Sequence, residues 1–268
     1  MLRKIFLTII TGLFAVLAVA QEYSLVQSEK EVQKIFTEIK DASSDELKDS
    51  LNQQLIVNLA AMLALPETFE YPFDSLQYLG KVYSSDGQIR LFTWNYPTRR
   101  GWQFNGFIQS KKGNIWQLLA PQTYEPSETG EIALEKWYGA LYYEVIACKL
   151  KRQTAYVLLG WSQKEECCQT KMIDLLVFDG EKPHLGKAIF EKSDEQFVCR
   201  RVFRYDKQAI MNLFFDTHKK QIVFDHLSPI HSGGYLDETT FGPDMSVDAY
   251  SRRGKVWILK EDIRVQNK

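Results

Sequence analysis

The sequence is poor in cysteine and has almost no net charge. Its 268 residues contain four cysteines, and 33 lysines and arginines nearly balance 34 aspartates and glutamates, which leaves a formal charge of −1 at pH 7. A chain without a basic excess has no electrostatic footprint for nucleic acid or for an acidic membrane surface. The cysteines also lack the short spacings, with a histidine nearby, that are typical of a structural zinc site. These shortages argue against a nucleic-acid partner and against zinc.

The four cysteines are Cys148, Cys167, Cys168 and Cys199. A bridge between the adjacent Cys167 and Cys168 would be strained, so a disulfide from one of them to Cys148 or Cys199 is favoured. Free, half-buried thiols are the equal alternative, because an oxidising compartment permits bridges but does not require them.

Long apolar runs are missing except at the start of the chain. Arg3 and Lys4 precede an apolar stretch over residues 5–19, and Ala18-Val19-Ala20 has the form of a cleavage site. This order is typical of a secretory signal peptide over residues 1–20, which is too short to be a spanning helix. No later segment of the sequence is long and apolar enough to span a membrane. We therefore expect export to the periplasm or the extracellular space, with a mature chain that starts at Gln21.

Motifs of the common catalytic classes are also missing. The sequence contains no G-x-S-x-G, H-E-x-x-H, Walker loop or dinucleotide-binding fingerprint. Ser232 follows His231, but neighbours in sequence are weak evidence for a nucleophile and its base. We assign no catalytic residue and predict no cofactor, and the sequence leans towards a protein that is not an enzyme.

Residues 21–80 carry the pattern of a helical hairpin. Ser28–Glu31 and Ser43–Glu46 both have the Ser-x-x-Glu form of a capping box. Apolar residues follow each box at helical spacing, and Pro66 ends the second helix. We expect the hairpin to pack on a sheet within one structural unit over residues 21–268.

From residue 81 onward the apolar period changes to two, which is typical of strands. Turn-forming segments such as Asp179-Gly180 separate about a dozen such stretches, and the connections are too short for crossover helices. The pattern predicts a mainly β domain over residues 81–268, an antiparallel meander that forms a sheet, barrel or sandwich. A small or incomplete β-propeller is the alternative. Four longer connections are expected at one end of the sheet, over residues 96–101, 120–137, 162–169 and 191–197.

The strand over residues 222–227 leads into a cluster of polar side chains. The candidate binding residues are Asp225, His226, Asp237, Asp244 and Asp248. Period two places Asp225 and His226 on opposite faces of the strand, so they cannot act as one pair. The structural interpretation is a carboxylate that caps a turn and a hydrogen-bonded interior histidine, and the functional interpretation is a ligand site.

The same loop has part of the pattern of a calcium site. Asp237, Gly242 and Asp248 stand at EF-hand positions one, six and twelve, but Phe241 cannot ligate and no helices flank the loop. An EF-hand is therefore excluded. A weak divalent cation site at Asp237, Asp244 and Asp248 is the interpretation that remains.

Basic pairs recur at the tips of hairpins between aromatic-rich strands. They are Lys111-Lys112, Lys151-Arg152, Lys219-Lys220 and Arg252-Arg253. Solvated turn residues that discourage edge pairing are the simpler interpretation, and a basic rim for an anionic glycan is the alternative.

Several short motifs follow one another in the β region: Phe92-Thr93-Trp94-Asn95, residues 136–143 (KWYGALYY), Leu158-Leu159-Gly160-Trp161, residues 222–227 (IVFDHL) and Gly242-Pro243-Asp244-x-Ser246-x-Asp248. In this order they resemble the motifs of a family of uncharacterised exported proteins common in Bacteroidetes. The resemblance spans residues 82–268 and implies export and a single β-rich domain. It implies no activity, cofactor or partner.

The leading functional hypothesis is an exported, non-enzymatic binding or scaffold protein of a bacterial envelope, with a glycan or an envelope protein as partner. One alternative is a hydrolase with its site among His226, Asp237, Asp244 and Asp248, which requires at least two of these side chains to meet in a cleft. The other is a carbohydrate-binding module, which requires two or more exposed, coplanar Trp or Tyr rings.

Overall fold

The structure of the chain is a computed structural model, and it describes residues 24–121, 127–151, 153–164, 168–230 and 240–263. The expected signal peptide, His231 and Asp237 lie outside these residues. The chain divides into two compact units, Met1–Tyr78 and Leu79–Lys268. The packing of the helices on the sheet stays a prediction.

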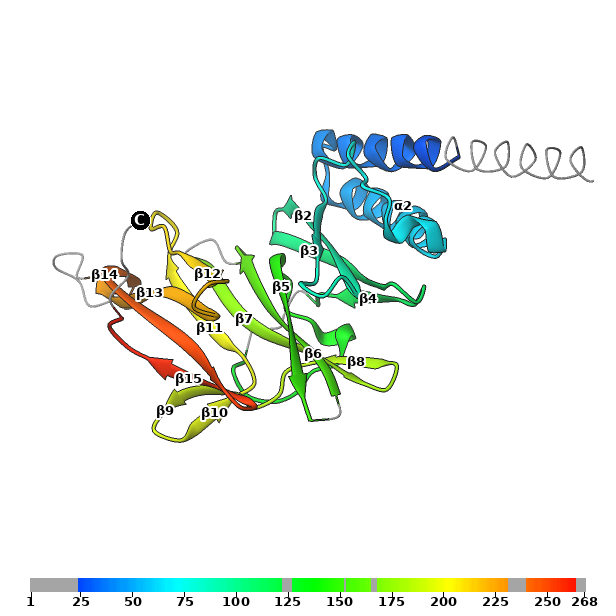
Figure 1. The fold of residues 1–268 in the computed structure, drawn as a ribbon. Coiled ribbons are helices and arrows are strands. Elements are labelled where there is room, and N and C mark those ends of the chain that lie inside the picture. Colours follow the sequence, from blue (N-terminus) through cyan, green and yellow to red (C-terminus); the bar gives the residue numbers. More distant parts are fainter. Residues whose placement is uncertain (1–23, 122–126, 152, 165–167, 231–239, 264–268) are drawn as a thin grey trace, which may run out of the picture. The chain divides into compact units, whose positions relative to one another are not determined.

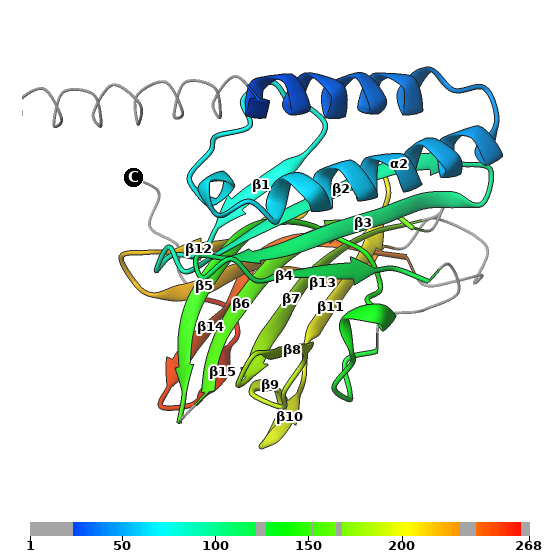
Figure 2. The same ribbon diagram turned by 90° about the vertical axis from the view of Figure 1, so that its right-hand side faces the viewer.

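The N-terminal unit contains the two expected helices, which lie side by side in Figures 1 and 2. The first covers residues 24–41, α2 covers Asp45–Leu63, and the 3-10 helix η1 (Pro66–Phe69) follows. The cap of α2 is Ser44 and not Ser43, the first residue of the predicted box. The Ser44 hydroxyl accepts a hydrogen bond from the Leu47 amide, which satisfies one of the free amides of a helix end. No helix in the described part of the chain is long and apolar enough to cross a membrane.

The first capping box is not a cap. The first helix already includes residues 24–27, so Ser28 lies inside it. The next residue, Glu29, is buried and accepts hydrogen bonds from the Tyr71 hydroxyl (2.7 Å) and the Ser75 amide (2.7 Å). These bonds attach the segment after α2 to the first helix, a long-range role that a local pattern does not reveal.

The second unit is built from three sheets of mainly antiparallel strands, so the predicted mainly β, antiparallel class is confirmed. The first sheet contains, in order, β1 (Gly80–Tyr83), β2 (Ile89–Thr98), β3 (Gly101–Ser110) and β4 (Ile115–Leu119). The second contains β11 (Arg201–Asp206), β7 (Cys168–Asp179), β6 (Gln153–Ser162) and β5 (Leu141–Leu150), with β8 (Lys182–Leu185) on β7. The third contains β10 (Gln196–Val198), β9 (Phe190–Ser193), β15 (Val256–Lys260), β14 (Thr240–Arg253), β13 (Gln221–Ile230) and β12 (Leu213–Asp216). The described strands close no barrel.

The second sheet is the middle layer of this unit. On β6, Ala155 and Val157 face a core shared with the third sheet, whereas Tyr156 and Leu158 face a core shared with the first sheet. Figure 1 shows β13–β15 opposite β7 and β11, and Figure 2 shows the first sheet lying across β5–β7. Burial on both faces explains why these strands read as continuous apolar runs rather than as alternating patterns.

Two of the four predicted long connections are wrong. Residues 96–101 form the end of β2, a tight turn and the start of β3, with the Thr98 hydroxyl donating to the Gly101 carbonyl (2.7 Å). Residues 191–197 belong to the hairpin of β9 and β10. The strands β8–β10 are short and only partly apolar, and for that reason their alternation did not stand out in the sequence.

The predicted disulfide from Cys148 or Cys199 is also wrong, because both are free thiols. Cys148 lies on β5 in the core between the second and third sheets, and Cys199 is buried beside Gly186. Burial raises the pKa of the Cys148 thiol to about 11, which makes it a poor nucleophile.

Candidate functional site

Three of the predicted site residues meet at a bulge between β13 and β14. The register pairs Asp225 with Val247 and Leu227 with Pro243, so His226 alone faces a three-residue segment of β14 that includes Asp244. Met245, in the middle of that segment, has a φ of 73° and is almost fully exposed. Bulges of this kind redirect side chains and are common beside functional sites.

His226 and Asp248 form a hydrogen-bonded pair. The Nδ1 atom of His226 lies 2.8 Å from Oδ2 of the buried Asp248, whose Oδ1 accepts a hydrogen bond from the Asp262 amide (3.0 Å). The bond from Asp248 raises the pKa of His226, and partial burial opposes this effect. The carboxylate thus orients the imidazole ring, and Nε2 is the ring nitrogen that does not bond Asp248.

Asp244 is engaged by two serines. Its carboxylate accepts hydrogen bonds from the Ser228 hydroxyl and from the hydroxyl (2.6 Å) and amide (3.0 Å) of Ser246. These bonds lower the pKa of Asp244 to about 2. Both hydroxyls donate to Asp244 and not to His226, so neither is prepared as a nucleophile by the histidine. His226 and Asp248 lie in contact, but neither lines the cleft described below, so the hydrolase hypothesis stays a prediction.

Asp225 points away from this pair, as the period of two predicted. Its Oδ2 atom accepts hydrogen bonds from the amide (2.7 Å) and side chain (3.0 Å) of Asn212, so it caps the segment before β12. Asp237 lies outside the described residues. Within the described ranges, no group of three or more His, Cys, Asp or Glu side chains could hold a metal ion.

We expect His226 to titrate at a higher pH in the native chain than in the Asp248→Asn variant, since asparagine keeps the shape but loses the charge. A raised folded pKa means that the pair stabilises the protein fully below the unfolded value of about 6.5, and that this stabilisation is lost as pH rises through the folded pKa. Following the His226 ring protons by NMR against pH measures the difference. Equal midpoints for the two proteins would contradict the assignment.

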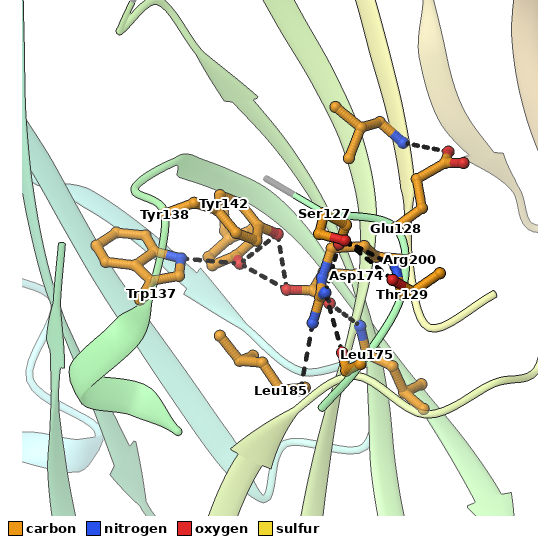
Figure 3. Close-up of polar contacts among 12 residues, drawn as sticks. Ser127, Glu128, Thr129, Trp137, Tyr138, Tyr142, Asp174, Leu175, Leu185 and Arg200 are labelled. Carbon is orange, nitrogen blue, oxygen red and sulfur yellow. Dashed lines mark hydrogen bonds and ion pairs between the residues drawn. The ribbon is translucent and has the colours of Figure 1, made fainter. Parts of the chain in front are cut away.

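A buried polar network that the sequence analysis missed lies in the middle layer (Figure 3). Asp174 on β7 and Arg200, between β10 and β11, are both fully buried and form an ion pair, with Nε 3.2 Å from Oδ1. The other carboxylate oxygen accepts from the hydroxyls of Tyr138 (2.7 Å) and Tyr142 (3.4 Å). Burial and then the charge of Asp174 raise the pKa of both tyrosines, so their hydroxyls remain donors.

The remaining bonds of Arg200 go to backbone carbonyls. They are made to Ser127 (2.6 Å), Gly130 (3.1 Å) and Leu185 (3.3 Å). The pair therefore fastens the segment around residues 127–130 to the sheet, and it is closed to solvent. We interpret it as structural. The sequence feature that indicates this ion pair is Asp174 itself, a lone carboxylate inside an apolar strand, because a buried charge requires a partner.

A cleft of about 470 Å³ opens where the ends of the three sheets meet. Turns and strands of the first sheet contribute one wall, β5–β7 contribute the other, and β14 contributes a single residue. The lining residues used below are Asp86, Lys112, Trp116, Cys148, Lys149, Tyr156, Phe178, Glu181 and Arg252. Its volume lies in the range of small-molecule sites in proteins. None of the five predicted site residues lines it.

Aromatic rings form the apolar wall of the cleft. Phe178 contacts Trp116 (ring centroids 5.3 Å apart, planes at 67°) and Tyr156 (6.1 Å, 84°). Trp116 and Phe178 are half-buried, and Tyr156 is buried. Edge-to-face rings make a slot rather than the flat, coplanar platform that the carbohydrate-binding alternative requires.

Basic side chains from three hairpins stand around the cleft. Lys112 comes from the turn after β3, Lys149 from β5 and Arg252 from β14. Two of the four basic hairpin tips singled out in the sequence, Lys111-Lys112 and Arg252-Arg253, thus contribute to one site. The presence of basic pairs in the sequence could not predict that the two tips share a site, because the tips belong to different sheets.

The chain matches no protein-family model, no curated protein and no solved structure.

Proposed function

We propose that the chain is an exported binding protein of a bacterial envelope and that the cleft is its site for a small ligand with a ring-shaped body. The observation that carries this proposal is the aromatic wall of Trp116, Tyr156 and Phe178 in a cleft of about 470 Å³. Pockets of this size with apolar walls and a few polar groups at the edge are typical of ligand sites.

Binding without conversion of the ligand is favoured by the chemistry of the lining. The thiol of Cys148 has its pKa raised to about 11 by burial, and the Tyr156 hydroxyl, which donates to Asp86 (3.4 Å), has its pKa raised by burial too. Neither group is poised to attack or to exchange a proton near neutral pH. The His226–Asp248 pair, which is better suited to proton transfer, does not line the cleft.

The test uses phenylnaphthylamine, a neutral aromatic dye that becomes fluorescent when it leaves water. We expect the purified chain to bind it in a saturable manner, and the Trp116→Ala variant to bind it about ten-fold more weakly because the ligand loses a ring contact. A fluorescence titration measures both dissociation constants.

The matched control is Trp161→Ala. Trp161 is also half-buried, but its indole donates to Gln169 (2.8 Å) and it does not line the cleft. Its removal should leave dye binding unchanged. If the dye fails to saturate, or if both variants weaken binding equally, the cleft is not the ligand site.

A further inference from the structure

We infer that the ligand of the cleft is an anion, with a carboxylate, sulfate or phosphate group held at the mouth by Arg252, Lys149 and Lys112. This inference rests on the proposed function, because it assigns the chemical class of the ligand that the cleft binds. Three separate hairpins bring these positive charges together around the mouth of the cleft.

Arg252 is held in place by neutral partners. Its Nε donates to the Gly254 carbonyl (3.2 Å), and its Nη2 donates to the Lys149 carbonyl on the edge strand β5. These bonds fix the guanidinium without cancelling its charge. The charge of the guanidinium also lowers the pKa of the Cys148 thiol, although the larger effect of burial raises it. The electrostatic field of Arg252 therefore reaches the thiol in the cleft.

The positive charges are not consumed by ion pairs. No described residue forms a salt bridge with Lys112, Lys149 or Arg252. Arginine and lysine together suit a carboxylate, sulfate or phosphate group, because a guanidinium fork matches planar oxyanions and an ammonium supplies a mobile point charge.

The two acidic side chains of the lining do not reverse this balance. Both oxygens of Asp86 accept hydrogen bonds within the protein. Its Oδ1 accepts from the Ser84 hydroxyl (2.6 Å) and the Gln88 amide (3.2 Å) of its own turn, and its Oδ2 accepts from the Tyr156 hydroxyl. Glu181 is the second acid. Three cations against two acids, one of them internally bonded, leave the mouth positive.

The ring wall and the positive mouth together define the ligand. Its apolar or sugar-like ring would lie against Trp116 and Phe178, and its acidic group would face Arg252. Acidic saccharides and aromatic acids share this chemistry. Both sources predict the same dependence on charge, so charge is the property to be tested first.

Two dyes with the same ring system isolate the charge. Anilinonaphthalene sulfonate carries a sulfonate, and phenylnaphthylamine carries none. We expect the full chain to bind the sulfonate about ten-fold more tightly at low ionic strength, and the preference to shrink in about 1 M salt, where charges are screened within about 3 Å.

The variant that tests the site is Arg252→Gln, and its control is Arg253→Gln. Arg253 is equally exposed in the same hairpin but does not line the cleft. Arg252→Gln should remove most of the preference for the sulfonate over phenylnaphthylamine. A far-UV circular dichroism spectrum that matches that of the native chain shows that the variant is folded.

Each outcome decides between the two claims. If the neutral dye binds in the cleft but the sulfonate is not preferred, or if Arg252→Gln keeps the preference, the anion inference is wrong and the binding function stands. If neither dye binds, both are wrong. If both arginine variants lose the preference equally, the charge acts over the whole hairpin and the assigned site is overturned. If the expected pattern holds, glucuronate and benzoate as competitors separate the saccharide from the aromatic source.

Discussion

Replacing Asp174 with asparagine is expected to lower the free energy of unfolding of the β unit by about 3–5 kcal/mol. Asparagine keeps the volume, but its single oxygen can replace only one of the two carboxylate oxygens, of which Oδ2 accepts from Tyr138 (2.7 Å) and Oδ1 accepts from the Leu175 amide (2.8 Å). What it removes is the negative charge opposite Arg200, whose side chain has no exposed surface. A guanidinium left buried without a counter-charge accounts for the size of the loss.

Urea unfolding followed by tryptophan fluorescence measures this effect. All six tryptophans lie between residues 94 and 257, so the signal reports the second unit and not the helices. Asp194→Asn is the control, since Asp194 is exposed in the turn between β9 and β10, and it should change stability by no more than about 0.5 kcal/mol. In the double variant with Arg200→Met, the loss should be smaller than the sum of the single losses, because the unpaired charge is gone. Additive losses would contradict the pairing.

Gly186→Ala is expected to destabilise the same unit by about 3 kcal/mol or more. Gly186 has a φ of 96°, a region that costs an L side chain about 1–2 kcal/mol. A β-carbon there would also lie 2.6 Å from Nη2 of Arg200 and 3.0 Å from the Gly130 carbonyl. Pushing Arg200 away would break its bonds to backbone carbonyls, so overpacking adds about 1–3 kcal/mol.

Gly180→Ala separates the two contributions. Gly180 also has a positive φ (64°), but nothing lies within 4 Å of the position its β-carbon would take. This variant should therefore show only the backbone cost. The comparison uses the same urea titration, and similar losses in the two variants would mean that the collision with Arg200 contributes nothing.

Local patterns account for much of the fold. The Asp179-Gly180 pair predicted a tight turn with positive φ, and β7 and β8 are joined there. Period two placed Asp225 and His226 on opposite faces, and they have different partners, Asn212 and Asp248. These features depend on residues close in sequence, where backbone geometry sets the outcome.

The candidate sites depend on residues far apart. Asp174 and Arg200 are separated by 26 positions, and Arg200 lies at the break between β10 and β11. In the same way, His226 was marked from sequence as a candidate, but its pairing with Asp248 depends on the register across the bulge.

By itself the sequence determined the class of structure: two helices and then antiparallel strands, because apolar periodicity and turn residues act over a few positions. Only the tertiary structure decided what the side chains can do. Stacking three sheets brings Lys112, Trp116, Lys149 and Arg252 around one cleft, and it leaves Asp225 as a cap and Asp174 as a buried counter-charge. The physical reason is that burial and charge pairing depend on which strands lie opposite one another, and no local pattern specifies that.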